Sequence, residues 1–209
     1  AILEELAARY KRKTVFISGA AHEYGTFPPA DALTYVFNLS SELIRDDYRV
    51  VTGFGLGIGS SVVNGALHQV YKVLKRRLKD ELVLRPFPQG PTAKAVWTDY
   101  RNDMLDMAGV AVYMFGNKVV EGQTGVHRSD GIVEEFDIAV AKGVKVLPLG
   151  FTGFVARELY DRVAADFARY YPRATQQFQT DFQLLGDATR SLQDQLGTTL
   201  SALRTLQTM

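Results

Sequence analysis

The sequence predicts an α/β domain in which helices cover both faces of a doubly wound, mainly parallel β-sheet. Short apolar runs alternate with longer segments whose apolar residues recur at helical spacing, an order typical of parallel sheets. The chain has 209 residues, 46% of them hydrophobic and 22% charged, which is enough for one well-buried core. We therefore expect a single domain of this class that ends in C-terminal helices.

The first quarter of the chain contains one strand–helix–strand unit. Residues 1–13 read as a short amphipathic helix that ends in a basic cluster, and the chain begins without methionine. We interpret these residues as a tail or linker from an upstream domain. A processed or truncated chain would begin in the same way. The domain proper is expected over 14–209. "TVFISG" at 14–19 is an apolar strand, a helix is expected over 30–47, and a second buried strand over 48–53.

The middle of the chain continues the alternation. A helix is expected from about residue 60 to residue 79, after a loop with four glycines. A third strand over 81–89 contains two prolines, which prevent a helix and a central strand there. A helix over 95–109 precedes "VAVYMFG" at 110–116, a run that is apolar on both faces, as a central parallel strand should be.

The last part of the chain supplies one more strand and the terminal helices. Residues 117–131 read as a loop, 132–143 as a helix with a glycine stop, and 144–150 as the fifth strand. The segments 151–172 and 178–206 are helical and best explained by packing or self-association.

Composition excludes several kinds of function. Lys and Arg total 24 against 23 Asp and Glu, so no large field attracts nucleic acid or an anionic membrane. There is no cysteine, and no apolar run approaches the roughly 20 residues that span a bilayer. His22, His68 and His127 lack the spacing of metal ligands. We expect a cytoplasmic protein that uses no metal and binds neither nucleic acid nor membrane.

The glycine-rich loop at 53–59 is the first candidate site. Ligands bind at the carboxyl ends of parallel strands, and this loop follows the second strand there. Its spacing fits neither a dinucleotide fingerprint nor a P-loop. Closely spaced glycines let backbone N–H groups and a helix N-terminus face a phosphate, although they also permit a tight turn with close helix packing. The candidate residues are Gly53, Gly55, Leu56, Gly57, Gly59 and Ser60.

Charged and polar residues follow the other strands at the same edge. Arg101, expected at the start of a helix, can grip a pyrophosphate or pair with a neighbouring aspartate, Asp99 or Asp103. Lys118 offers a point charge or is a solvated loop lysine, and Asn117 shares the site or shapes the turn. Glu134 and Glu135 stand in the expected first turn of a helix, where the dipole alone favours acids.

Five further residues are expected at the edges of this site. Ser18, Gly19 and Ala20 end the first strand and offer backbone donors, unless they form a plain strand end. Phe87 and Arg85, in "RPFPQG", are placed to stack on a base, although a buried aromatic residue is an equal alternative.

These motifs together resemble a known superfamily. "VFISGAA", "GFGLGIGSSVVNGAL", "YRNDM", "FGNK" and "GIVEEF" are similar to the LOG superfamily of Rossmann-like domains, over residues 14 to about 155. The resemblance implies a phosphate site in the glycine loop, a nucleotide contact at Arg101 and a catalytic acid at Glu134 or Glu135. It would make the chain a nucleoside 5'-monophosphate phosphoribohydrolase, but "RSDGIVEEF" lacks the Pro-Gly-Gly start and the threonine of that family.

A second resemblance is more specific. "RPFPQG", "YRNDM", "FGNK" and "EEF" look like the SLOG domain, also called STALD, of Thoeris anti-phage effectors. The resemblance implies a sensor without catalytic residues or cofactors, which binds a cyclic ADP-ribose isomer made by a TIR-domain partner. It also implies an attached upstream effector, either a sirtuin-like NADase or a TIR domain, and a homodimer or higher homo-oligomer.

Overall fold

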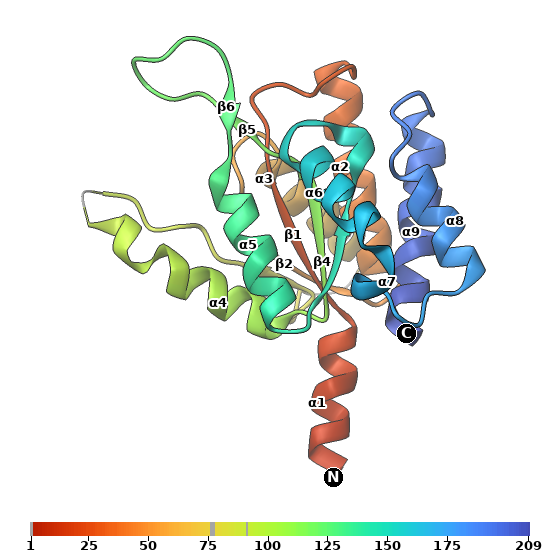
Figure 1. Ribbon diagram of the computed structural model, residues 1–209. Coiled ribbons are helices and arrows are strands. Elements are labelled where there is room, and N and C mark those ends of the chain that lie inside the picture. The colour runs from red at the N-terminus through yellow and green to blue at the C-terminus, as the bar shows by residue number, and fades with distance from the viewer. Residues whose placement is uncertain (1, 76–77, 91) are drawn as a thin grey trace.

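The computed structural model describes residues 2–75, 78–90 and 92–209, and its centre is a parallel sheet with helices on both sides (Figure 1). Five strands are hydrogen-bonded in the order β3-β2-β1-β4-β7. Their bounds are Thr14–Ala20 for β1, Arg49–Thr52 for β2, Leu82–Leu84 for β3, Val110–Phe115 for β4 and Lys145–Pro148 for β7. The predicted fold class is therefore confirmed.

Strands β1 and β4 occupy the interior of the sheet because their residues are apolar almost without interruption. All six residues of β4 are buried, and so are the first six residues of β1. Phe16 of β1 pairs with Val51 of β2 on one side and with Ala111 of β4 on the other. All carboxyl ends consequently point to the same edge of the sheet, which we call the carboxyl edge.

Most helices follow the predicted order along the chain. Pairs α2 and α3, and α4 and α5, pack against each other, while α6 packs on β4 and β7 and α9 packs on α2 and α8. The bounds are Ile2–Arg12 for α1, Pro29–Arg45 for α2, Gly59–Leu67 for α3, Trp97–Met107 for α4, Asp130–Ala141 for α5, Phe154–Ala165 for α6, Phe167–Tyr170 for α7, Gln176–Leu184 for α8 and Leu192–Thr208 for α9.

Several predicted boundaries were wrong. Strand β3 has only three residues, because Pro86 and Pro88 cannot donate to a ladder. The helix expected over 60–79 is α-helical only to Leu67 and continues as a π-helix over His68–Val73; residues 76–77 lie outside the described residues. The expected loop at 117–131 holds a small antiparallel hairpin of β5 (Asn117–Lys118) and β6 (His127–Arg128).

Figure 1 shows that α1 projects from the end of the sheet opposite the β5–β6 hairpin. This helix confirms the helical interpretation of residues 1–13 for its described part, since residue 1 lies outside the described residues, and none of its residues is buried. In the part of the chain that the structure describes, no helix is both long and apolar enough to cross a membrane.

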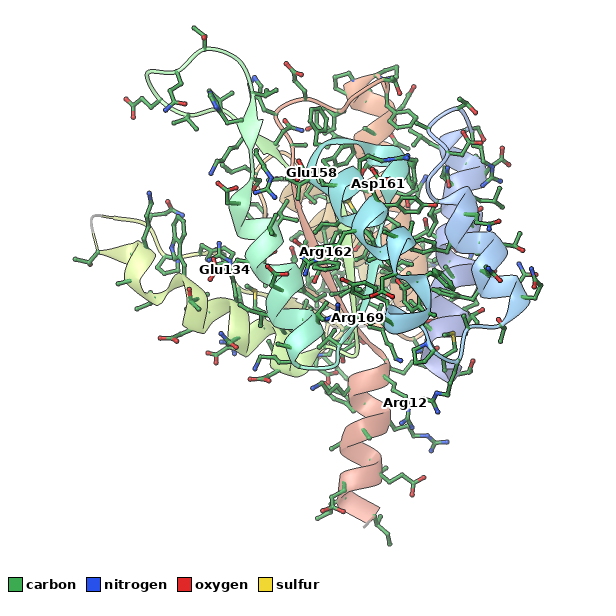
Figure 2. The ribbon with its side chains drawn as sticks, in the orientation of Figure 1. Arg12, Glu134, Glu158, Asp161, Arg162 and Arg169 are labelled. Carbon is green, nitrogen blue, oxygen red and sulfur yellow. The ribbon has the colours of Figure 1, made fainter. Side chains whose placement is uncertain are left out.

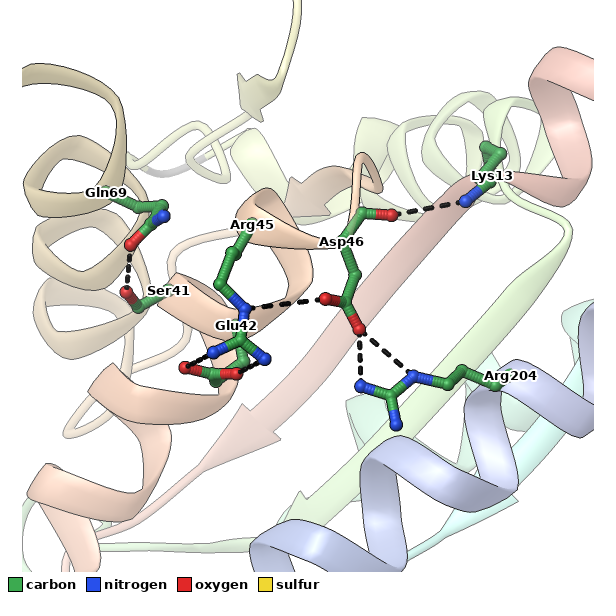
Figure 3. Close-up of polar contacts among 7 residues, drawn as sticks. All are labelled: Lys13, Ser41, Glu42, Arg45, Asp46, Gln69 and Arg204. Atoms are coloured by element: carbon green, nitrogen blue, oxygen red, sulfur yellow. Dashed lines mark hydrogen bonds and ion pairs between the residues drawn. The ribbon is translucent and has the colours of Figure 1, made fainter. Parts of the chain in front are cut away.

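Near the base of α1, Asp46 ties three distant segments together (Figure 3). Its carboxylate oxygen Oδ2 accepts from Arg204 of α9 through Nε at 3.1 Å and Nη2 at 2.6 Å. Its backbone carbonyl accepts from Lys13 Nζ at 3.2 Å, just before β1. Helix α2 therefore ends at a residue that joins it to α9 and to the start of β1.

Candidate functional site

Arg101 is the centre of a buried charged cluster at the carboxyl edge. Its side chain is only 8% exposed. Its Nη1 lies 2.9 Å from Glu134 Oε2, and its Nε lies 3.5 Å from Glu135 Oε1. The predicted alternative partners Asp99 and Asp103 were wrong, because α4 begins at Trp97 and Arg101 therefore stands in its second turn, turned toward α5.

Glu135 is the buried acid of the cluster. Its Oε2 accepts a hydrogen bond from Ser18 Oγ at the end of β1. Burial raises the pKa of Glu135 to about 7, although the Ser18 hydrogen bond and the positive charge of Arg101 favour the ionised form. Glu135 is thus a carboxyl group that gains and loses its proton near neutral pH.

Glu134 is the exposed acid of the cluster, with 38% of its side chain accessible. Besides Arg101, it accepts a hydrogen bond from Thr98 Oγ1 at 2.5 Å. Figure 2 labels Glu134 on the side of α5 that faces α4. Both glutamates stand in the second turn of α5 and not in the first, because this helix begins at Asp130. Both contact Arg101.

An aromatic wall lies against Arg101. Its guanidinium carbon is 5.0 Å from the centroid of the Phe87 ring and 5.8 Å from that of Trp97. Phe87 also contacts Trp97 edge-on and Tyr100 at 6.0 Å. The backbone can approach this wall only because Gly53 has no Cβ, since a Cβ there would lie 2.7 Å from the Phe87 ring. Phe87 is therefore partly buried by protein.

Gly131 was missed as a site residue. A Cβ at this position would lie 2.6 Å from Nη2 of Arg101, so a larger residue would push the guanidinium out of its present position. The available signal was the glycine of "GIVEEF", four residues before Glu135. Thr98, Trp97 and Tyr100 were also missed, since nothing in a linear sequence shows that α4 turns this face toward α5.

The glycine loop lies directly on the end of β1. A Cβ at Gly55 would be 1.7 Å from the carbonyl oxygen of Gly19, and one at Gly57 would be 1.8 Å from that of Ala21. The amide of Ala21 donates to the carbonyl of Leu56 at 2.8 Å. The close-packing explanation of these glycines therefore holds, whether or not the loop also binds a ligand.

Three backbone amides of the same loop have no hydrogen-bond partner among the described residues. Within the described residues, the amides of Gly55, Leu56 and Gly57 donate no hydrogen bond. Leu56 is 78% exposed, and Ser60 in the first turn of α3 is also exposed. Gly59 is buried against Phe54. Unpaired amides beside a helix N-terminus form a surface that suits an anion.

The remaining predicted residues lie around this centre. The backbone carbonyl of Ala20 accepts from the amide of Gly116. Asn117 is buried and shapes a loop, because its Oδ1 accepts from the amides of His22 and Glu23. Lys118 is half-buried in the β5–β6 hairpin. Arg85 lies 4.0 Å from Asp103 and belongs to a separate surface pair.

The geometry thus brings together two halves of the site through consecutive residues of β1. Ser18 donates to Glu135, and Gly19 contacts the glycine loop. Because Arg101 already faces two acids, the free backbone amides are better placed for phosphate than Arg101 is, and Glu134 is better placed for hydroxyl groups. Over the described ranges, no group of three His, Asp or Glu side chains is arranged to hold a metal ion.

Comparison with known proteins identifies the family of the chain. The chain matches STALD, described as the Sir2- and TIR-associating SLOG family, over residues 1–205. It is 38% identical over 205 residues to the NAD(+) hydrolase ThsA of Bacillus cereus (strain MSX-D12), covering 98% of this chain and 43% of that protein. It is 40% identical to the ThsA of Cytobacillus dafuensis, covering 91% of this chain and 39% of that protein.

The chain therefore spans less than half the length of these two curated relatives. Among solved structures, an X-ray structure titled TM1055, a structural genomics target, matches with a TM-score of 0.49 and 17% identity, over 71% of this chain and 80% of that chain. The family match extends over nearly every residue, from α1 through α9. The chain belongs to the STALD family, the Sir2- and TIR-associating branch of the SLOG domains.

Proposed function

We propose that this chain is a ligand-sensing regulatory domain of Thoeris anti-phage defence. Its signal is a cyclic ADP-ribose isomer made by a TIR-domain partner, and its response is to activate an attached NAD-hydrolysing effector in the cytoplasm. The observation that carries the proposal is the similarity to a ThsA protein, which covers 98% of this chain but only 43% of that protein. The remaining length of such a relative is enough for an effector domain. This effector is either a sirtuin-like domain or a TIR domain.

The site supports a nucleotide signal in physical terms. Free amides of Gly55, Leu56 and Gly57 suit a pyrophosphate, and the dipole of α3 adds to their attraction. Glu134 is exposed and fixed by Arg101 and Thr98, so it can accept hydrogen bonds from ribose hydroxyls. Lys118, on the hairpin at the same edge, supplies a further positive charge. The aromatic wall at Phe87 offers a face for the base.

A signal changes an attached effector only if it binds two states of the assembly with different affinity. We propose that these states differ in self-association and that the domain works as a homodimer or larger homo-oligomer. In this role no residue of the domain is catalytic and no cofactor is required.

The test is isothermal titration of the chain with cyclic ADP-ribose isomers, with ADP-ribose, NAD and AMP as comparators. We expect micromolar or tighter binding of one cyclic isomer. Glu134→Gln should weaken it about tenfold or more, because a hydrogen bond to a charged acceptor contributes about 1.5–3 kcal/mol. Arg101→Ala is less suitable, since it would leave two acids without their cation.

The control is Glu42→Gln, the same substitution in an exposed i, i+3 pair near the C-terminus of α2. It should leave the affinity unchanged. If none of the cyclic isomers binds to the folded chain, the sensing proposal is wrong.

A second function is favoured by one observation, the neutral-range pKa of the buried Glu135 beside Arg101. A carboxyl group of this kind is suited to act as an acid in cleavage of a glycosidic bond. A phosphoribohydrolase of the LOG type would release base from AMP or a cytokinin nucleotide and would lose this activity in Glu135→Gln. Such release, without binding of cyclic isomers, would replace the sensor proposal.

A further inference from the structure

Phe54, between Gly53 and Gly55 in the glycine loop, has a backbone conformation that is unfavourable for its residue type. Its φ is +57°, in the left-handed region that glycine adopts freely and residues with a side chain rarely do. Such strain persists only where the surrounding structure maintains it, and it is concentrated at functional sites. A glycine would occupy this position without strain, so the ring of Phe54 calls for an explanation.

Two other phenylalanines with positive φ show what ordinarily offsets such strain. Phe115 at the end of β4 has φ +57° and is 1% exposed, and Phe154 at the start of α6 has φ +53° and packs against the hydrophobic core. In both residues, burial of the ring stabilises the fold. Phe54 lacks this compensation, because it is 40% exposed. Of the twelve phenylalanines, all of which the structure describes, it alone lies exposed on the surface.

The apolar residues of the glycine loop are divided between the core and the surface. Ile58 is 1% exposed and contacts the end of β1, where a Cβ at Gly19 would lie 2.5 Å from its Cδ1. Phe54 and Leu56 are exposed instead, Leu56 to 78%. The three loop amides that follow Phe54 donate no hydrogen bond to any described residue. An exposed apolar pair thus lies directly beside unpaired donors.

The position of the Phe54 ring limits which ligand covers both features. One edge of the ring lies against the first residue of α3, since a Cβ at Gly59 would be 2.9 Å from Cδ2 of Phe54. An aromatic base can stack on the exposed part of the ring while a phosphate joined to it binds the unpaired amides. A nucleotide carries both groups in one molecule, whereas a free phosphate would leave the ring in water.

Phe87 is the other candidate for stacking on a base, but protein groups already contact its ring. The guanidinium carbon of Arg101 lies 5.0 Å from the ring centroid, and Trp97 and Tyr100 also contact the ring. A base on Phe87 would have to displace one of these groups. A base on Phe54 would bind a surface that the described chain leaves exposed.

We propose that Phe54 is the base-stacking residue of the candidate site, and that its ring binds the base of a nucleotide whose phosphate is held by the glycine loop. Stacking on an aromatic side chain tolerates any base, so Phe54 selects for the presence of a base and not for its identity. The inference rests on the proposed function in that both place a nucleotide in this loop. It does not require a cyclic ligand, so the two proposals can fail separately.

The first test compares AMP with ribose 5-phosphate, which lacks the base, by isothermal titration of the whole chain. The wild type should bind AMP about tenfold or more tightly than ribose 5-phosphate, because stacking contributes strongly to the binding of a base. Phe54→Leu keeps an apolar side chain but removes the ring, so the two affinities should become nearly equal. Phe54→Tyr keeps the ring and should keep the ratio of the two affinities.

The matched control is Phe154→Leu, which also replaces a phenylalanine with positive φ, but one that packs against the core. It should lower the stability of the fold and leave the affinity ratio unchanged. Phe87→Leu tests the other candidate for stacking, and it should also retain the ratio.

The second test measures the strain at Phe54. Phe54→Gly should have a higher midpoint of urea denaturation than Phe54→Ala, because glycine adopts φ +57° freely and alanine does not. Circular dichroism of each variant checks that the domain is folded. Equal midpoints would show that this position is not strained, and the argument for a function of the ring would then be overturned.

An affinity ratio that Phe54→Leu leaves intact overturns the proposal, and so does a ratio that is lost in Phe87→Leu alone. Where AMP does not bind, a cyclic ADP-ribose isomer replaces it, and equal affinity in wild type and Phe54→Leu overturns the proposal while the sensing function stands. Binding of AMP through Phe54 without binding of any cyclic isomer supports this inference and overturns the sensing function. If neither AMP nor a cyclic isomer binds, both proposals are wrong.

Discussion

A single pair of neighbouring residues connects the two halves of the candidate site. Ser18 donates to Glu135, and the carbonyl of Gly19 lies under Gly55 of the glycine loop. Protonation of Glu135 and occupation of the loop therefore act on the same end of β1. We therefore expect the protonation of Glu135 and the binding of a ligand in the glycine loop to influence each other.

Glu135 should make stability depend on pH. Its pKa rises from 4.5 to about 7 on folding, so between these values the folded state binds more protons than the unfolded state. The free energy of unfolding therefore falls as pH rises through this range, by an amount on the order of 3 kcal/mol. The stabilisation is complete below about pH 4.5 and is lost above about pH 7.

Urea denaturation at pH 5 and pH 8 measures this effect as the difference between wild type and Glu135→Gln. The variant should lack this part of the pH dependence. Glu158→Gln, at a half-exposed glutamate paired with Arg128, should retain it. Equal pH dependence in wild type and Glu135→Gln would show that Glu135 titrates at its ordinary value.

At the residue scale, the sequence predicted Arg101 and Glu135 as site residues but did not predict their contact with each other. Glu135 and Arg101 were predicted as site residues from their motifs, and the structure brings them together. Their mutual pairing was not predictable, because it depends on how α4 and α5 pack against each other in three dimensions. Gly131 was overlooked for the same reason, since its role exists only relative to Arg101.

Among the elements, the glycine loop shows the clearest sequence requirement. Gly55→Ala would place a Cβ 1.7 Å from the carbonyl oxygen of Gly19, so the backbone must move. We expect a loss of about 1–3 kcal/mol in the free energy of unfolding, together with weaker ligand binding. Denaturation and titration of the same sample measure both.

The matched control is Gly197→Ala in α9. A Cβ there meets nothing within 4 Å, and the helix interior prefers alanine by up to about 1 kcal/mol. This variant should be as stable as the wild type or more so. A Gly55→Ala variant that is equally stable would mean that the loop can leave β1 without cost.

Alternation of strand and helix was enough to predict the sheet, because β1 and β4 are apolar almost throughout and so mark buried parallel strands. The short elements were not predictable in the same way. The π-helix at His68–Val73 has no separate sequence signal, and the β5–β6 hairpin pairs only two residues on each side. Such pairings depend on tertiary context more than on local pattern.

At the scale of the whole molecule, Asp46 links segments that lie 158 residues apart in the chain. Asp46→Asn should remove the charge attraction to Arg204, a residue whose side chain is 53% exposed. Because solvent screens this pair, we expect a loss of only about 0.5–1 kcal/mol in the free energy of unfolding.

Asp161→Asn provides the comparison, since its pair with Arg157 is local and more than half of the Asp161 side chain is exposed. It should change stability by less than Asp46→Asn, and salt should reduce the difference between the two. Equal effects in urea denaturation would show that the long-range link contributes no more than a local surface pair.

The position of Trp97 in the aromatic wall has a practical consequence. It is the one tryptophan in the chain, its ring lies 5.8 Å from the guanidinium of Arg101, and its indole N–H donates to the carbonyl of Pro88. Excitation at wavelengths that tyrosine does not absorb therefore reports on the candidate site alone. The intrinsic fluorescence of the unlabelled protein should change in colour or intensity when a ligand enters, which gives a direct optical record of how fast it arrives and leaves.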